Sequence, residues 1–124
     1  MASKKGHLEV VKYLVSVGGN PDVKTNKGWS PIIDASANGH LEVVKYLIQI
    51  GCNKNDKTNS NNTSLHQAAK KGHFKVVEFL VSIRVDLSDK NEDGKTPLDI
   101  AKEKQNENEN YKKIMNLLLK SGAK

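Results

Sequence analysis

The nine-residue segment GHLEVVKYL occurs twice without change, at residues 6–14 and again at residues 39–47. A third copy, GHFKVVEFL, occupies residues 72–80, so the three copies begin at Gly6, Gly39 and Gly72 with one constant spacing. A fixed period of roughly 20–50 residues is typical of stacked-repeat proteins, in which each unit buries its apolar face only against its neighbours. The period therefore predicts an elongated solenoid that offers a binding surface, rather than an enzyme built around one pocket.

A hydroxyl side chain marks the start of the first helix in each period. Ser30, Thr63 and Thr96 recur with the same spacing as the repeated segment, and proline follows the first and the last of them. Such a hydroxyl accepts a hydrogen bond from a free N–H group of the first helical turn, and proline loses nothing there because its nitrogen carries no hydrogen. Asp99 adds the Thr-x-x-acid pattern of a capping box to Thr96. We therefore expect a short helix after each of these three residues.

Glycine and alanine show where these first helices end and how they pack. Gly39 and Gly72 follow the helices, and glycine tolerates the left-handed conformation in which a helix stops. Alanine recurs in register where neighbouring helices are expected to approach closely, at Ala35, Ala68 and Ala101.

The second helix of each period follows the Gly-His pair and is expected to end near residues 16, 49 and 82. Its apolar stripe is broad, which indicates burial against more than one neighbour. In the middle copy the stripe consists of Leu41, Val43, Val44, Leu47, Ile48 and Ile50.

A largely polar segment separates each second helix from the next first helix. Gly28, Asn61 and Gly94 share one register within these segments. Glycine and asparagine are the residues that tolerate positive φ, so we expect a tight turn at the tip of a hairpin. The repeating unit is therefore helix, turn, helix and protruding loop.

These residues resemble the ankyrin repeat family. The TPL segment at Thr96, the Ser-Pro pair at Ser30, the Gly-His pairs and the VVxxL helices carry the resemblance over almost the whole chain. The histidine that the family has after TPL is present only as His66. The family's glycine after the second helix is Gly51 in one repeat but Arg84 in the next, which should strain that turn.

The resemblance implies an all-α solenoid of stacked helix-turn-helix units with protruding β-hairpin-like loops. We expect a single domain over residues 1–124, and whether it is a fragment of a longer array or a full-length protein stays open. Its expected repeats are a truncated repeat 1 (1–24), repeat 2 (25–57), repeat 3 (58–90) and repeat 4 (91–124), which carries the polar insertion QNENEN and ends as a cap.

Composition restricts the compartment and the classes of partner. The formal net charge is +6, but Arg84 is the single arginine, and readout of nucleic-acid bases favours the bidentate arginine fork. Cys52 is the single cysteine, which excludes an internal disulfide and suits a reducing compartment. No apolar run approaches the roughly 20 residues that cross a bilayer, and we expect no signal peptide. We expect the protein in the cytoplasm, with the nucleus as the alternative.

Catalytic and metal chemistry find little support in the sequence. His7, His40 and His73 recur in register, but stacked helices lie about 8–10 Å apart, whereas zinc ligands lie about 2 Å from one ion. We therefore expect these histidines to satisfy backbone groups at the turn between the helices. Cys52 and His66 are interpreted as structural rather than as a thiol nucleophile and its base. We expect no enzyme activity, no metal and no cofactor.

The resemblance also implies where a protein partner would bind, through the hairpin tips and the exposed side of the first helices. The basic face that these positions form predicts a partner with an acidic segment. Trp29 fits either a binding hot spot or packing on the neighbouring loop. The corresponding positions are Lys4, Lys5, Lys24, Asn26, Lys27, Trp29, Asn38, Lys57, Asn59, Asn62, Lys70 and Lys71.

The favoured function is a non-catalytic scaffold for protein–protein interaction, acting as a monomer without a small-molecule substrate or membrane insertion. Self-association through the truncated first repeat stays open. Two alternative functions are a basic module that docks on nucleic acid or on an anionic membrane, and one part of a larger ankyrin-containing protein whose activity lies elsewhere.

Overall fold

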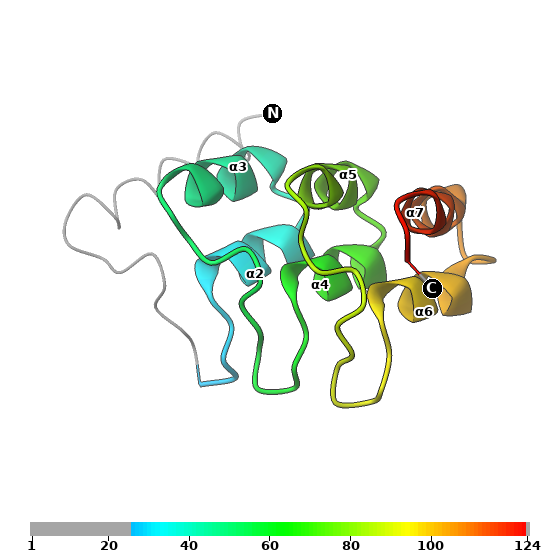
Figure 1. Cartoon of the computed structure of the whole chain (residues 1–124), viewed down its shortest axis with the longest axis horizontal. Coiled ribbons are helices and arrows are strands. Elements are labelled where there is room, and N and C mark those ends of the chain that lie inside the picture. Colours follow the sequence, from blue (N-terminus) through cyan, green and yellow to red (C-terminus); the bar gives the residue numbers. More distant parts are fainter. Residues whose placement is uncertain (1–25, 124) are drawn as a thin grey trace.

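The computed structural model describes residues 26–123, which form six helices in three pairs (Figure 1). One layer contains the first helices and the other contains the second helices, while the connecting loops protrude on one side. The arrangement confirms the all-α solenoid, and expectations for residues 1–24 lie outside the described residues. The pairs are α2 (Pro31–Ala37) with α3 (Leu41–Gln49), α4 (Ser64–Lys71) with α5 (Phe74–Ser82), and α6 (Pro97–Lys104) with α7 (Glu109–Lys120).

Two of the three expected helix caps form as the sequence predicts. The Thr63 hydroxyl oxygen accepts from the backbone N–H of His66 at 3.2 Å, and the Thr96 hydroxyl accepts from that of Asp99 at 3.1 Å. In both cases the third side chain of the helix bonds back to the N–H of the cap residue, which completes a capping box.

The third cap differs from the prediction. Ser30 has the same extended backbone, but its buried hydroxyl has no hydrogen-bond partner in the part of the chain that the structure describes. Ile33 occupies the position of His66 and Asp99, and its aliphatic side chain returns no hydrogen bond to the cap. Proline at position 31 and backbone bonding therefore start α2 without a side-chain cap.

His66 links the third repeat to the fourth. Its Nδ1 accepts from the backbone N–H of Thr63 at 3.2 Å, and its Nε2 lies 2.8 Å from the carbonyl oxygen of Lys95. Both bonds form at once only in the neutral tautomer that carries the hydrogen on Nε2. The ring is fully buried, and this burial lowers the pKa of His66 below its ordinary value.

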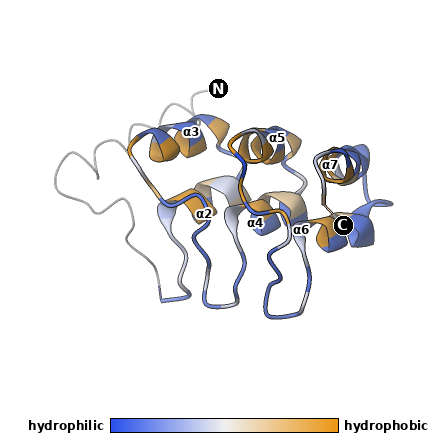
Figure 2. Ribbon diagram, in the orientation of Figure 1, coloured by the Kyte–Doolittle hydropathy of each residue, from blue (hydrophilic) through white to orange (hydrophobic). Residues whose placement is uncertain are grey.

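The core lies between the two layers of helices (Figure 2). The middle of each second helix supplies buried aliphatic side chains, as the sequence stripe predicts. The alanines expected at close approaches are buried where α2 packs on α4 and where α4 packs on α6. The most buried members include Val43, Val44, Leu47, Val76, Val77, Leu80, Ala35, Ala68 and Ala101.

Successive loops are joined by backbone hydrogen bonds that recur from one repeat to the next. The backbone N–H of Asn59 donates to the carbonyl of Lys27 at 3.0 Å, and the N–H of Glu92 donates to that of Ser60 at 2.8 Å. Gly28 has φ +80°, and a Cβ atom there would lie 2.7 Å from the backbone nitrogen of Asn59. Glycine is therefore required at this tip by both its conformation and the approach of the next loop.

The remaining tips confirm the predicted turn. Asn61 and Gly94, in register with Gly28, also have positive φ, at +62° and +75°. Within residues 26–123 the one β-type contact is an isolated antiparallel bridge between Lys57 and Thr63. The loops are therefore hairpin-shaped, with almost no strand.

The polar insertion lies between α6 and α7 and extends into the first turn of α7. The side chain of Asn108 caps α7, whose first residue is Glu109, so part of the insertion becomes helix. The hydroxyl of Tyr111 then donates to the carbonyl of Lys70 at 2.9 Å. Tyr111, the residue after the insertion, therefore ties the last helix to the end of α4.

The turn after α5 carries the strain that the sequence predicts. Arg84 has φ +62°, in the left-handed region, where Gly51 of the preceding repeat has φ +98°. A side chain in this region costs about 1–2 kcal/mol, while glycine loses about 0.5–1 kcal/mol of extra chain entropy.

Replacing Arg84 by glycine is therefore expected to raise the free energy of unfolding by about 0.5–1 kcal/mol. The matched variant Gly51→Ala should lower it by a similar amount, although no other atom lies within 4 Å of the added Cβ. Urea denaturation of both variants checks the pair, and a loss of stability in Arg84→Gly would contradict the strain.

His66 should make stability depend on pH. Because its folded pKa is lowered, the unfolded chain binds the proton first as pH falls, so stability is present above about pH 6.5 and is lost below it. His66→Ala should cost about 2 kcal/mol at pH 7.5, since it leaves the Lys95 carbonyl unsatisfied. The difference between variant and parent in urea midpoint should shrink at pH 5.5. Equal pH shifts of both proteins would contradict this prediction.

Candidate functional site

The described part of the chain offers neither a metal site nor a membrane-spanning helix. Residues 26–123 contain no group of three histidine, cysteine, aspartate or glutamate side chains that could hold a metal ion. In the same residues, no helix is both long and apolar enough to span a bilayer. The predictions of no cofactor and no catalysis stay predictions.

The repeated histidine at the inter-helix turn has the structural role that the sequence predicts. Nε2 of His73 lies 3.0 Å from the carbonyl oxygen of Ala37 in the preceding repeat. A Cβ atom at Gly39 would lie only 2.6 Å from Nδ1 of the same ring. The histidine therefore packs on the previous repeat, where it satisfies a carbonyl at the end of α2.

Cys52 and His66 do not form a nucleophile and base. The thiol of Cys52 is buried in the core and forms no disulfide among the described residues, while Nδ1 of His66 bonds to Thr63 and Nε2 to Lys95. Both residues therefore support the packing of the repeats.

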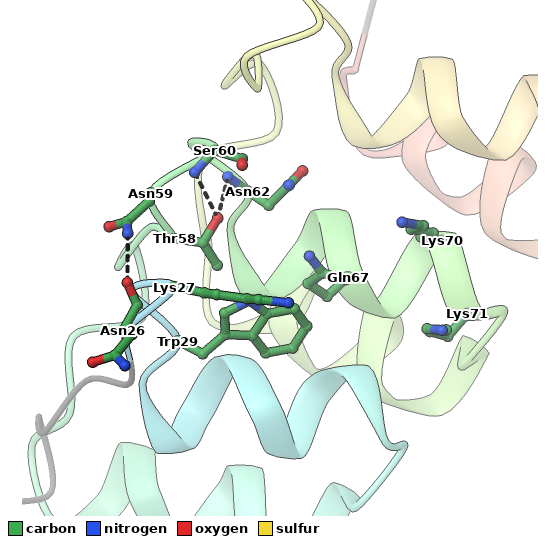
Figure 3. A pocket seen from close by; sticks show the side chains of 10 residues that line it. All are labelled: Asn26, Lys27, Trp29, Thr58, Asn59, Ser60, Asn62, Gln67, Lys70 and Lys71. Carbon is green, nitrogen blue, oxygen red and sulfur yellow. Dashed lines mark hydrogen bonds between the residues drawn. The ribbon is translucent and has the colours of Figure 1, made fainter.

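An open pocket of about 570 Å³ lies where the first two described loops meet α4 (Figure 3). Three segments line it. The first precedes α2, the second is the next loop along the solenoid, and the third is the exposed side of α4. The lining residues are Asn26, Lys27, Trp29, Thr58, Asn59, Ser60, Asn62, Gln67, Lys70 and Lys71.

Local structure explains why these side chains meet. Residues 67, 70 and 71 are three and four positions apart on α4, so they share one side of the helix. The loop wall is held by Thr58, whose hydroxyl oxygen accepts from the N–H groups of Ser60 and Asn62, each at 3.2 Å. The side-chain amide of Asn59 donates to the carbonyl of Asn26 at 2.9 Å and fixes the two loops together. Backbone-anchored elements therefore form the pocket on every side.

The pocket has a strongly positive lining. Lys27, Lys70 and Lys71 contribute three ammonium groups, and no aspartate or glutamate is among the lining residues. None of the three forms an ion pair within residues 26–123. Nearby lysines differ, because Lys57 pairs with Asp89 at 3.4 Å and Lys95 pairs with Glu103 at 2.8 Å. The lining of the pocket therefore carries three positive charges that no described carboxylate neutralises in an ion pair.

Trp29 packs on the rest of the protein and also lines the pocket, while its role as a hot spot stays a prediction. Its side chain is half-buried and packs against the hydrophobic core, and the residue also lines the pocket. Figure 3 shows the indole beside Gln67, with Lys70 and Lys71 further along α4. The ring is thus a partly fixed aromatic surface that a ligand in the pocket could contact.

The structure gathers seven of the twelve predicted positions around this pocket. Asn38 lies apart at the end of α2, with its side-chain amide on the Asp34 carbonyl at 2.8 Å. Lys57 is not among the lining residues and pairs with the following repeat. Lys4, Lys5 and Lys24 lie outside the described residues. The seven are Asn26, Lys27, Trp29, Asn59, Asn62, Lys70 and Lys71.

Sequence reasoning missed Gln67 and Thr58, both of which line the pocket. Gln67 shares its register with Asp34 and Ile100, so the framework does not fix this position. That variability is the signal in the sequence that could have drawn attention to it.

Comparison with known families agrees with this architecture. A family model for ankyrin repeats, three copies long, matches residues 1–91 and again residues 56–124. No curated protein matches the chain in a sequence search.

Proposed function

The chain belongs to the ankyrin repeat family, and on that premise we propose that it binds an acidic segment of a protein partner in the pocket between its loops and α4. Ankyrin repeats are generally modules for protein–protein interaction and are typically non-catalytic. Beyond these general properties of the family, we propose that the partner is acidic, that the pocket is its binding site, and that the protein acts in the cytoplasm or the nucleus.

One observation carries the proposal. Lys27, Lys70 and Lys71 line the same pocket as a half-buried tryptophan, the pocket has no acidic lining residue, and the three lysines form no ion pair in the described part of the chain. Clustered charges of one sign favour a ligand of the opposite sign and speed its encounter with the site. The half-buried aromatic ring of Trp29 in the same pocket supplies contact area, as tryptophan does at binding hot spots.

A nucleic acid or an anionic membrane is the runner-up, because either would also meet the lysines. Polyanion binding through several lysines weakens steeply with salt, since counterions are released. A protein segment that also packs on Trp29 should retain more of its affinity. The two ligand classes are therefore distinguished by salt dependence.

The test uses a synthetic library of fluorescein-labelled decapeptides with aspartate or glutamate at alternate positions, followed by fluorescence anisotropy. Single-stranded DNA and vesicles containing phosphatidylserine serve as polyanion probes. We expect the selected peptide to bind more tightly than either polyanion at 150 mM salt. Preference for DNA or vesicles at that salt, with a steep salt slope, would replace the proposed partner.

Trp29→Ala should weaken binding of the selected peptide by about 2 kcal/mol, or roughly thirtyfold. Binding is measured well below the melting temperature of the variant, because the half-buried ring also supports the fold. Unchanged affinity would exclude Trp29 from the interface.

Reversal of Lys70 and Lys71 to glutamate should mainly slow association with the peptide, since charges at the rim of an interface act on the encounter rate. Lys112→Glu with Lys120→Glu makes the same change in net charge on exposed positions of α7, outside the pocket. If this control pair slows association equally in stopped-flow measurements, only the overall charge matters and the pocket is not the site.

A further inference from the structure

Gln67 is a largely buried side chain whose amide end opens into the pocket. Only 5% of the residue is exposed, yet its amide atoms are not among the fully buried, unpartnered polar atoms of residues 26–123, which are the hydroxyl oxygens of Ser30, Ser36 and Ser64. No hydrogen bond joins the amide to another described residue, so its donor and acceptor face the space of the pocket, where a ligand group can replace water. Figure 3 shows the amide end directed into the pocket, between Trp29 and Asn62.

The framework itself does not call for glutamine at this position. Asp34 stands exposed in the same register of α2, and Ile100 is buried in the same register of α6. This register therefore accepts an apolar side chain where the position is buried and a charged side chain where the position is exposed to solvent. Packing between the repeats thus does not require an amide at position 67, and the group is available to a ligand in the pocket.

On the premise of the proposed function, we infer that Gln67 binds a backbone peptide group of the acidic segment and holds that segment in an extended form across the pocket. A carboxamide offers one oxygen acceptor and an NH₂ donor, which match the N–H and C=O of a peptide unit. A carboxylate would use only the donor. Side chains on either side of the bound peptide group then reach the lysines and the indole.

The surroundings of Gln67 favour an extended backbone over a helix. A helix satisfies its own N–H and C=O groups internally, so it presents no free peptide group to the amide of Gln67. Lys27 lies on the loop side of Gln67, and Lys70 and Lys71 lie further along α4. Acidic residues on both sides of one peptide group can therefore each meet a lysine.

The variant Gln67→Met tests the contact because methionine keeps the length of the side chain but removes its donor and acceptor. With the decapeptide selected above, we expect binding about tenfold weaker than for the parent protein and an unchanged salt slope. Gln49→Met is the matched control, since Gln49 is exposed on α3 and outside the pocket.

A set of peptides in which single backbone amides are replaced by esters locates the peptide group. One ester should weaken binding to the parent protein but not to Gln67→Met, because the hydrogen bond is already absent in the variant. The side-chain NH₂ signals of Gln67 in a ¹H–¹⁵N spectrum of the parent protein should also move when the peptide is added. This last measurement does not depend on the folding of any variant.

The results separate the two proposals. Parent-like binding by Gln67→Met, with binding still weakened by reversal of Lys70 and Lys71, would overturn the role of Gln67 and leave the proposed function intact. Weaker binding without an ester position coupled to Gln67 would also overturn the backbone contact. If no library member binds the parent protein, both proposals fail.

Discussion

The fold of the described residues depends on contacts between successive repeats, and these contacts recur at one fixed spacing. Small side chains at Ala35, Ala68 and Ala101 let the first helices approach closely, and the loop bonds from Asn59 to Lys27 and from Glu92 to Ser60 recur in step with them. Each repeat is too small to bury its own apolar stripe, so these contacts provide the core. A sequence that keeps this spacing can change most other positions without losing the fold.

The three registers of the first helix show how the fold separates structural from variable positions. At the cap, serine or threonine recurs because a helix start needs an acceptor. Three residues later, Ile33, His66 and Asp99 use different chemistry, and only the last two return a hydrogen bond. One residue further on, the side chains differ completely, and there Gln67 enters the pocket. The pocket is thus lined from the register on which packing makes the weakest demand.

The sequence predicts the elements of the fold because their signals are local. Caps, helix-ending glycines and positive-φ tips act within a few residues, and the structure confirms them, including the left-handed Arg84. What the sequence does not predict is which partner a polar side chain finds. The Ser30 hydroxyl has no partner among the described residues although Ser30 matches the cap pattern, and Lys57 pairs with Asp89 of the next repeat. Contacts between adjacent repeats join residues that are far apart in the sequence, so the place of the Gln67 amide in the pocket is visible only in the structure.

The candidate site is carried by the most constrained helix that the structure describes. Among the first helices, α4 packs on both α2 and α6, and its capping box with His66 is tied to the next repeat through Lys95. Its far end is held by the Tyr111 hydroxyl on the Lys70 carbonyl. A helix fixed in this way presents Gln67, Lys70 and Lys71 with little loss of backbone freedom on binding, which favours affinity. The amide of Gln67 is therefore presented to the pocket by the first helix that is held at both ends.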